Sequence, residues 1–317
     1  MTTPRAAPLA NLDGKVAFIT GGSSGIGLGI ACACREAGMR VVFTYRRADH
    51  RDDALAQLDE FGRTGSDVRA IELDVTDREA FSRAADEAEQ AFGAVHLLVC
   101  NAGVGIRAGA AEATFKDWDW ALGVNLGGVI NGVATFLPRL RAHGAGAHIV
   151  GTASTSGLVA GGKTGVYATS KFAVLGLMES LRDELDGSSV GVSVFCPGFV
   201  RSNLVESEKM RPTALVNEIA KPSTLPPSAA EEAMMRKFMA LAMDPREAGR
   251  RVLDGVRRNH LHILTHAEFG QPVRERMEAL LAAFPAEPAP TARAAIARRF
   301  MTDLYARERA RREQADE

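Results

Sequence analysis

The chain has 317 residues, of which 46% are hydrophobic and 24% are charged, as is ordinary for a folded globular protein. Its formal net charge of −1 gives no electrostatic reason to expect a nucleic-acid or membrane partner. The four cysteines are scattered and lack metal-site spacing, which favours a reducing compartment. We see neither a secretory signal nor a run of about 18 apolar residues, and we predict a cytoplasmic protein.

The first predicted unit is a strand, a glycine-rich turn and a helix. Residues 15–20 form a short apolar run, residues 21–27 contain four glycines, and residues 28–37 have helical character. Glycines let the backbone approach a pyrophosphate, and the start of a helix offers unpaired N–H groups to it. The turn therefore predicts a nucleotide site.

The second predicted strand, residues 40–45, bears on the choice of cofactor. Enzymes that use NAD usually carry a carboxylate about 20 residues after the glycines, where it binds the ribose hydroxyls. Here the sequence has Tyr45, Arg46 and Arg47. A guanidinium binds a 2′-phosphate, so we predict NADP(H) rather than NAD(H). The alternative is that the two arginines are solvated loop residues.

The rest of the first 266 residues continues to alternate between strands and helices. Further strands are predicted at residues 70–73, 95–100, 148–152, 190–196 and 261–266, and helices at 52–60, 78–92 and 118–140. Such alternation indicates an α/β fold with a parallel, doubly wound sheet of about seven strands and helices on both faces. Ligands of such sheets bind beyond the carboxyl ends of the strands.

Tyr167 and Lys171 are four residues apart in a predicted helix. Residues at this spacing share one face, so the phenol and the ammonium group would lie side by side. A neighbouring cation favours the phenolate, and we expect Lys171 to lower the pKa of Tyr167 toward neutrality. The pair is then a candidate acid–base catalyst, although the spacing alone also arises by chance.

Taken together, these segments resemble the short-chain dehydrogenase/reductase family over residues 12–203. The carboxyl ends of the predicted strands carry Asp74-Val75, Asn101-Ala102-Gly103 and the segment 197–202, which all match motifs of that family. Cys100 stands where the family often has Asn, and Ser202 stands where Thr is commoner. The resemblance implies a Rossmann-type fold and nicotinamide-dependent oxidation or reduction.

The resemblance also assigns roles to individual residues. It implies a catalytic tetrad of Asn125, Ser154, Tyr167 and Lys171, in which Tyr167 transfers the proton, Ser154 binds the substrate oxygen and Asn125 holds a water near Lys171. The predicted cofactor contacts are Gly21, Ser23, Ser24, Gly25, Ile26, Gly27, Tyr45, Arg46, Arg47, Asp74, Val75, Asn101, Ala102, Gly103, Tyr167, Lys171, Pro197, Gly198, Val200 and Ser202. The predicted substrate contacts are Ser154, Ser156, Tyr167 and Phe199.

Residues 203–243 lie where the family has its substrate lid. Prolines 222, 226 and 227 interrupt this stretch, and methionines 210, 234, 235, 239 and 243 are concentrated in it. Methionine adapts to varied apolar surfaces, although ordinary helix packing explains such residues equally well. With Phe199, Val104 and Leu158 near the expected pocket, the stretch favours an apolar or aromatic alcohol or ketone.

Residues 267–317 extend beyond the usual end of the family, whereas residues 1–11 form a short tail. Two helices are predicted in the extension, at 273–284 and 291–312, the second with an apolar stripe at Ile296, Phe300 and Leu304. We expect the extension to pack on the same domain or on a partner subunit of a homodimer or homotetramer. Histidines 260, 262 and 266 lie close together in sequence but lack companion ligands, so no metal site is predicted.

A looser resemblance links the chain to bacterial family members that oxidise benzylic alcohols of lignin-type aryl ethers. Those proteins tend to have an acidic residue after the second strand, and Tyr45-Arg46 departs from it. Two other functions stay open: an epimerase or isomerase that keeps its cofactor bound, and a non-catalytic protein that senses NADP(H). The tetrad argues against the sensor, which does not need all four groups.

Overall fold

The structure is a computed structural model that describes residues 9–61, 67–218 and 228–315. The described residues form two compact units, one ending at Thr265 and the other beginning at His266.

The first unit contains a seven-stranded sheet in the order β3-β2-β1-β4-β5-β6-β7, and every pair of neighbouring strands is parallel. The predicted doubly wound fold is therefore confirmed. The strands are β1 (Val16–Ile19), β2 (Arg40–Tyr45), β3 (Val68–Glu72), β4 (Leu97–Cys100), β5 (Ala147–Thr152), β6 (Val190–Cys196) and β7 (His262–Leu264).

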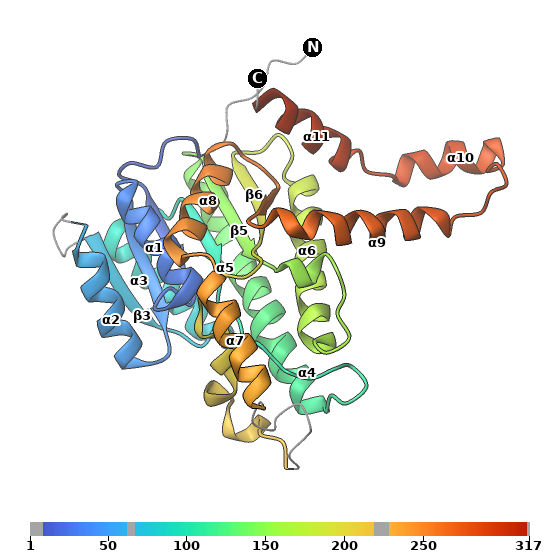
Figure 1. Cartoon of the computed structure of the whole chain (residues 1–317). Helices are drawn as coiled ribbons and strands as arrows, with labels where there is room; N and C mark the ends of the chain where they lie inside the picture. Colours follow the sequence, from blue (N-terminus) through green and yellow to red (C-terminus); the bar gives the residue numbers. More distant parts are fainter. Residues whose placement is uncertain (1–8, 62–66, 219–227, 316–317) are drawn as a thin grey trace. The chain divides into compact units, whose positions relative to one another are not determined.

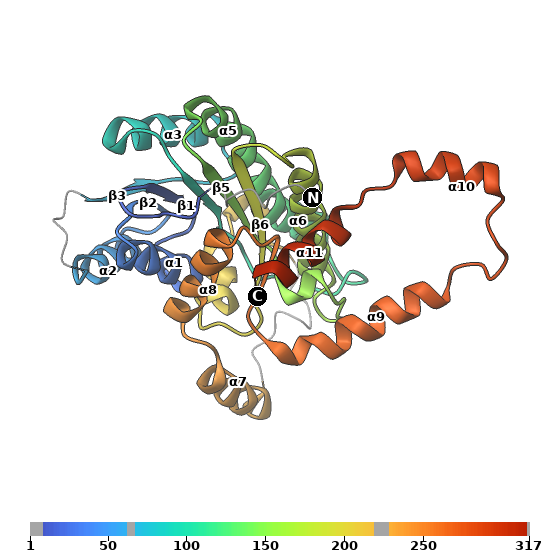
Figure 2. The same cartoon turned by 90° about the horizontal axis from the view of Figure 1, so that it is seen from above.

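Helices cover both faces of this sheet, as Figure 2 shows. On one face lie α1 (Gly25–Glu36), α2 (Ala48–Asp59) and α8 (Pro245–Arg257). On the other lie α3 (Arg78–Phe92), α5 (Gly128–His143) and α6 (Gly165–Glu184). The chain order of the elements can be followed in Figure 1.

The two faces are packed differently. A large aliphatic core joins the sheet to α1 and α8. These two helices approach so closely that a Cβ atom on Gly249 would lie 2.3 Å from the Gly29 carbonyl oxygen. On the opposite face Phe18, Phe81 and Phe136 form an aromatic cluster with ring centroids 4.7–6.3 Å apart. Burial on both faces explains why the strands read as continuous apolar runs.

The long helix predicted at 118–140 is divided in the structure. It consists of α4 (Phe115–Leu122), a π-helical turn η2 (Gly123–Gly127) and α5. The whole stretch from Phe115 to His143 includes an 18-residue window of mean hydropathy 1.4, although we expected no run able to span a membrane. Half of that window is buried inside the fold, and Trp120 and Phe136 are core residues, so the stretch is a core helix by its packing.

The predicted lid is only partly described. It contains the 3-10 helices η4 (Asn203–Met210) and η5 (Thr213–Leu215) and the helix α7 (Ala229–Leu241). The three prolines at 222, 226 and 227 lie outside the described residues, as does the side chain of Met235. A bridge between Val200 and Met243 joins the two ends of the stretch.

The second unit is helical, with η7 (Ala267–Phe269), α9 (Gly270–Ala282), α10 (Thr291–Ala297), η8 (Arg298–Phe300) and α11 (Leu304–Ala315). The single helix predicted at 291–312 is therefore wrong. The backbone is extended at Met301, and the Thr302 hydroxyl accepts a hydrogen bond from the N–H of Leu304. Threonine favours such capping positions over helix interiors, which explains the break and removes the predicted apolar stripe.

Candidate active site

Tyr167 and Lys171 lie on the same face of α6, as their spacing predicts. The Lys171 Nζ atom is 5.7 Å from the centroid of the Tyr167 ring. Its side chain is buried, and Nζ donates a 2.9 Å hydrogen bond to the carbonyl oxygen of Thr152 at the end of β5. That bond fixes the ammonium group at the carboxyl edge of the sheet, beside the phenol.

Ser154 lies two residues after the end of β5 and is also buried. Its backbone is extended, and its hydroxyl oxygen accepts a 3.1 Å hydrogen bond from the N–H of Ser156 at the start of the short helix η3 (Thr155–Gly157). This local turn places the hydroxyl close enough to Tyr167 on α6 to influence the pKa of its phenol. Two of the predicted catalytic groups are therefore neighbours.

The pKa of Tyr167 differs from the sequence-based expectation. Burial raises the pKa of this phenol, and the hydrogen bond with Ser154 opposes the rise without cancelling it. Burial likewise lowers the pKa of Lys171 to about 8. In the chain by itself, loss of hydration is the largest influence on both groups, so the expected lowering at Tyr167 is not found.

Asn125 lies in the π-helical turn η2 and is completely buried. Its Oδ1 accepts a 2.7 Å hydrogen bond from the N–H of Val104, and its Nδ2 donates to the Val104 carbonyl at 3.0 Å. Nδ2 also lies 3.0 Å from the hydroxyl of Ser170 on α6. Turns of this kind often occur at functional sites, and here the turn joins three elements around the candidate site.

Gly103 occupies the space between Asn125 and Lys171. A Cβ atom at this position would lie 3.2 Å from Asn125 Oδ1 and 3.5 Å from Lys171 Nζ. The tight spacing accounts for glycine here, and it places the Asn101–Gly103 segment directly beside the predicted tetrad.

The glycine turn lies at the carboxyl end of β1 and is closely packed. Gly21 and Gly25 have φ values of +63° and +51°, which residues with a side chain rarely adopt. A Cβ atom on Gly27 would lie 2.2 Å from the Gly21 carbonyl oxygen and 2.5 Å from Asn101 Nδ2. The turn thus leaves backbone rather than side chains to line the start of α1, as a pyrophosphate cradle requires.

Thr20 and Thr44 support this turn, and sequence reasoning assigned no role to either. The Thr20 hydroxyl accepts hydrogen bonds from the N–H groups of Asn101 and Ala102, at 2.9 and 3.1 Å. The Thr44 hydroxyl accepts a 3.1 Å hydrogen bond from the N–H of Gly21. Both threonines stand at strand ends, which was the only signal available.

The residues predicted to bind the adenosine end lie after β2 and β3. Arg46 forms an ion pair with Asp74 at 3.5 Å, with both side chains 39% exposed. Arg47 instead pairs with the exposed carboxylate of Asp49 at the start of α2. Arg51, which the sequence did not single out, lies 5.4 Å over the ring of Tyr45. Arg46 and Arg51 are therefore the two cations that border the predicted adenine region.

The segment 197–202 is fixed at both ends. The N–H of Gly198 donates a 2.9 Å hydrogen bond to the hydroxyl of Thr265, and the Phe199 carbonyl accepts one of 2.8 Å from the N–H of Met243. Ser202 packs against the glycine turn, since a Cβ atom on Gly25 would lie 2.9 Å from the Cβ atom of Ser202. The Phe199 side chain is 42% exposed. The backbone of Phe199 is thus fixed at the carboxyl edge of the sheet, and its ring is partly exposed there.

Cys196, at the end of β6, is a neighbour of the tetrad that sequence reasoning did not include. Burial raises the pKa of its thiol to about 12, so the thiol is neutral in the vicinity of Lys171. A separate hollow of about 360 Å³ lies at Gly25, Ser202 and the first turn of α8 but touches no member of the tetrad.

Comparison with known proteins gives matches over most of the chain. The family model described as short chain dehydrogenase matches residues 15–212. A C alpha-dehydrogenase from Sphingobium sp. (strain NBRC 103272 / SYK-6) is 36% identical over 276 residues, covering 86% of this chain and 87% of that protein. An NADP-dependent (R)-specific alcohol dehydrogenase from Lentilactobacillus kefiri is 36% identical over 198 residues, covering 62% of this chain and 77% of that protein.

Solved structures agree with this result. A short chain dehydrogenase/reductase from Burkholderia phymatum in complex with NAD superposes with a TM-score of 0.80 at 34% identity, covering 88% of this chain and 99% of that chain. LigO from Sphingobium sp. strain SYK-6, in its apo form, gives a TM-score of 0.70 at 37% identity, covering 96% of this chain and 97% of that chain.

Proposed function

Because the chain belongs to the short-chain dehydrogenase/reductase family and is thus an NAD(P)-dependent oxidoreductase, we propose that it interconverts a secondary alcohol and a ketone using NADP(H). The observation that carries the proposal is that the Lys171 Nζ atom lies 5.7 Å from the Tyr167 ring centroid, with Ser154 close enough to influence the pKa of the phenol and with Asn101–Gly103 joining this site to the glycine turn. The nicotinamide cofactor, when bound, supplies or accepts the hydride.

Tyr167 is assigned the proton transfer. In the reductive direction its phenol gives a proton to the carbonyl oxygen, and in oxidation the phenolate takes one from the alcohol. The hydroxyl of Ser154 lies within reach of the same oxygen and stabilises its developing charge. A raised phenol pKa in the unliganded chain suits the proton-donating role, and a cation brought close to Tyr167 would lower that pKa for the reverse reaction.

Lys171 and Asn125 are assigned supporting roles. The Lys171 ammonium is anchored by Thr152 and keeps donors that can bind ribose hydroxyls. Asn125 Oδ1, with one hydrogen bond from Val104, has a second lone pair that can accept from a water linking Lys171 to solvent. The residues that would hold the dinucleotide are the glycine turn, Asn101–Gly103 and the segment ending at Ser202.

NADP(H) is preferred because cations rather than a carboxylate follow β2. Arg46 is partly exposed and paired only loosely with Asp74, so its guanidinium can turn to a 2′-phosphate. Arg51 over Tyr45 adds positive charge to the same region. One relative is named as NADP-dependent, whereas one similar structure holds NAD.

The substrate is proposed to be apolar or aromatic. Phe199 is 42% exposed beside the site, and Val104 and Ile106 supply buried apolar surface on the loop after β4. The looser resemblance to family members that oxidise benzylic alcohols supports an aryl alcohol or aryl ketone. The four cysteines are all unpaired and buried, which supports a cytoplasmic location.

The experiment is to follow reduced-nicotinamide absorbance with a panel of aryl ketones and alcohols, each with NADP(H) and with NAD(H). We expect turnover with at least one aryl substrate and a higher kcat/KM with NADP(H). Tight NADPH binding without any absorbance change would instead favour a sensor, and stereochemical scrambling without net reduction would favour an epimerase.

A further inference from the structure

A buried arginine joins the first half of the lid to α4. The Arg211 side chain is 4% exposed and the Asp117 side chain 2% exposed, and Arg211 Nη2 lies 3.0 Å from Asp117 Oδ1. The guanidinium also binds Glu208 through Nε and Nη2, at 2.7 and 2.8 Å. Its central carbon lies 4.3 Å from the centroid of the Trp120 ring on the next turn of α4. One guanidinium is thus held by two carboxylates and an aromatic face.

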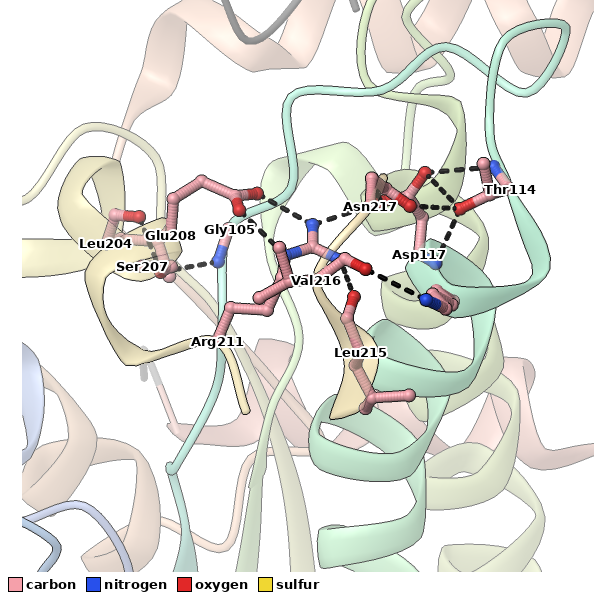
Figure 3. A network of polar contacts seen from close by, with 11 residues as sticks. Gly105, Thr114, Asp117, Leu204, Ser207, Glu208, Arg211, Leu215, Val216 and Asn217 are labelled. Carbon is pink, nitrogen blue, oxygen red and sulfur yellow. Dashed lines mark hydrogen bonds and ion pairs between the residues drawn. The ribbon is translucent and has the colours of Figure 1, made fainter. Parts of the chain in front are cut away.

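Asp117 is a suitable anchor because α4 holds it rigidly. It is the third residue of a capping box, in which Thr114 and Asp117 satisfy each other's backbone N–H groups. Its Oδ2 accepts hydrogen bonds from the Thr114 N–H and hydroxyl at 2.9 and 3.0 Å. Its Oδ1 accepts one of 2.9 Å from Asn217, so both oxygens are fully used (Figure 3).

The same lid segment is tied to the candidate active site at its other end. The hydroxyl of Ser207 accepts a 2.8 Å hydrogen bond from the N–H of Gly105 and donates to the Leu204 carbonyl at 2.7 Å (Figure 3). A Cβ atom on Gly105 would lie 2.8 Å from the Leu204 carbonyl oxygen. Gly105 follows Val104, whose backbone is bound by Asn125.

These contacts form a continuous connection from Asn125 through the loop after β4 to η4, and from η4 to α4. Between Arg211 and Asn217 the chain makes further contacts with α4: Lys116 donates a 3.0 Å hydrogen bond to the Val216 carbonyl. At its base the segment is joined to Met243 through Phe199 and Arg201. Residues 199–218, which lead into the lid and form its described first half, are therefore held at their base, middle and far end.

We propose that Arg211 is a positioning residue that fixes residues 199–218 as a preformed wall of the substrate pocket. This inference rests on the proposed oxidoreductase function, because it gives that wall the role of holding the alcohol or ketone against Tyr167. The substrate would then bind to a wall that is already ordered, so that no binding free energy is lost in ordering it. Arginine is needed since lysine cannot bind both carboxylates in a planar fork while stacking on Trp120.

The test compares Arg211→Lys and Arg211→Met with the wild-type protein and with Arg139→Lys. Arg139 is a matched control, because it also binds two carboxylates, Asp86 and Glu89, but does so between α5 and α3. Arg211→Lys keeps the buried positive charge opposite Asp117. It therefore allows the test to be made even if Arg211→Met does not fold.

The first readout is amide hydrogen exchange of the full-length protein without substrate. We expect exchange in residues 203–218 to be roughly tenfold or more faster in Arg211→Lys, with exchange in β5 and α6 unchanged and Arg139→Lys like wild type. Equal exchange in residues 203–218 for wild type and Arg211→Lys would overturn the inference. This readout needs no activity, so it stays informative even if the proposed function is wrong.

The second readout is kinetic, with the best substrate of the aryl panel. We expect KM for that substrate to rise about tenfold in Arg211→Lys, with NADPH affinity unchanged and kcat within about threefold of wild type. A merely structural role would lower the melting temperature and leave KM unchanged in the folded fraction. An unchanged KM, or an equal loss of NADPH affinity, would contradict the positioning role.

Discussion

The side chain of Asn125 forms two hydrogen bonds with the backbone of Val104, accepting from its N–H at 2.7 Å and donating to its carbonyl at 3.0 Å. The Asn125 side chain thus satisfies both backbone groups of Val104, as a neighbouring strand would in a sheet. Both Val104 groups lie in a buried region, where unpaired backbone groups are costly. The arrangement explains why an amide is required at a position surrounded by valine and leucine.

Replacing Asn125 with Leu should therefore affect both stability and turnover. It leaves the N–H and the carbonyl of Val104 without their partner, and each unsatisfied buried group costs about 1–3 kcal/mol. We expect the free energy of unfolding, measured with urea, to fall by about 3 kcal/mol or more. Asn131→Leu is the matched control, because Asn131 binds a single carbonyl, that of Val75. An Asn125→Leu protein as stable as Asn131→Leu would refute this reading.

Tyr167→Phe removes the phenolic oxygen and keeps the ring. We expect kcat to fall by roughly 10²- to 10⁴-fold, because the proton donor and acceptor is lost. The affinity for NADPH, measured by fluorescence titration, should stay nearly unchanged, since the glycine turn and Lys171 are intact. Loss of NADPH binding in this variant would show that Tyr167 acts mainly in cofactor binding and not in proton transfer.

The choice of cofactor is tested by Arg46→Ala. A charge-assisted hydrogen bond contributes about 1.5–3 kcal/mol, so NADPH affinity should fall by roughly ten- to a hundredfold. NADH lacks the 2′-phosphate, and its affinity should be almost unaffected. Arg69→Ala is a suitable control, because Arg69 pairs with Glu87 on the surface of β3 and α3. Equal losses for the two cofactors would contradict the 2′-phosphate role of Arg46.

How far the sequence predicted the site depended on the kind of contact. The glycine turn and the Tyr167–Lys171 spacing were readable because both depend on local geometry, and the parallel sheet followed from alternating apolar runs. The Arg211–Asp117 pair spans 94 positions (211 minus 117) and has no local pattern, so only the fold brings the two residues together. The π-helical turn at Asn125 could not be predicted either, because its apolar neighbours have the pattern of an ordinary α-helix.

The pKa of Tyr167 was the main chemical expectation that the structure changed. The sequence placed a cation four residues away but gave no measure of burial. In the fold both side chains are removed from water, and that loss of hydration raises the pKa of the phenol and lowers that of the ammonium group. Spacing along a helix predicts which groups meet but not how deeply they are buried.

A histidine outside the predicted tetrad should contribute to the acid sensitivity of the fold. His148, on β5, is completely buried, and its Nε2 lies 2.7 Å from the hydroxyl of Ser193. That hydroxyl donates to the His260 carbonyl, so Nε2 must carry the proton and Nδ1 has none. Nδ1 has no hydrogen-bond partner among the described residues, and a Cβ atom on Gly191 would lie 2.3 Å from it. A second proton would thus be buried without an acceptor.

The pKa of His148 is lowered from 6.5 to about 3, first by burial and then by the positive charge of Arg182. A histidine whose pKa is lower in the folded state contributes stability above pH 6.5, and that contribution is lost as the pH falls toward 3. At pH 5 only the unfolded chain has bound the proton, so the expected loss relative to pH 7.5 is about 2 kcal/mol.

His148→Gln tests this, because glutamine can still hydrogen-bond Ser193 but does not titrate. The free energy of unfolding is measured with urea at pH 7.5 and pH 5 for both proteins. We expect the wild type to lose about 2 kcal/mol more than His148→Gln over this interval. His96, whose pKa burial lowers to about 4, titrates in both proteins, so its contribution cancels in the comparison. If the two proteins lose stability equally, His148 does not contribute to the acid sensitivity of the fold.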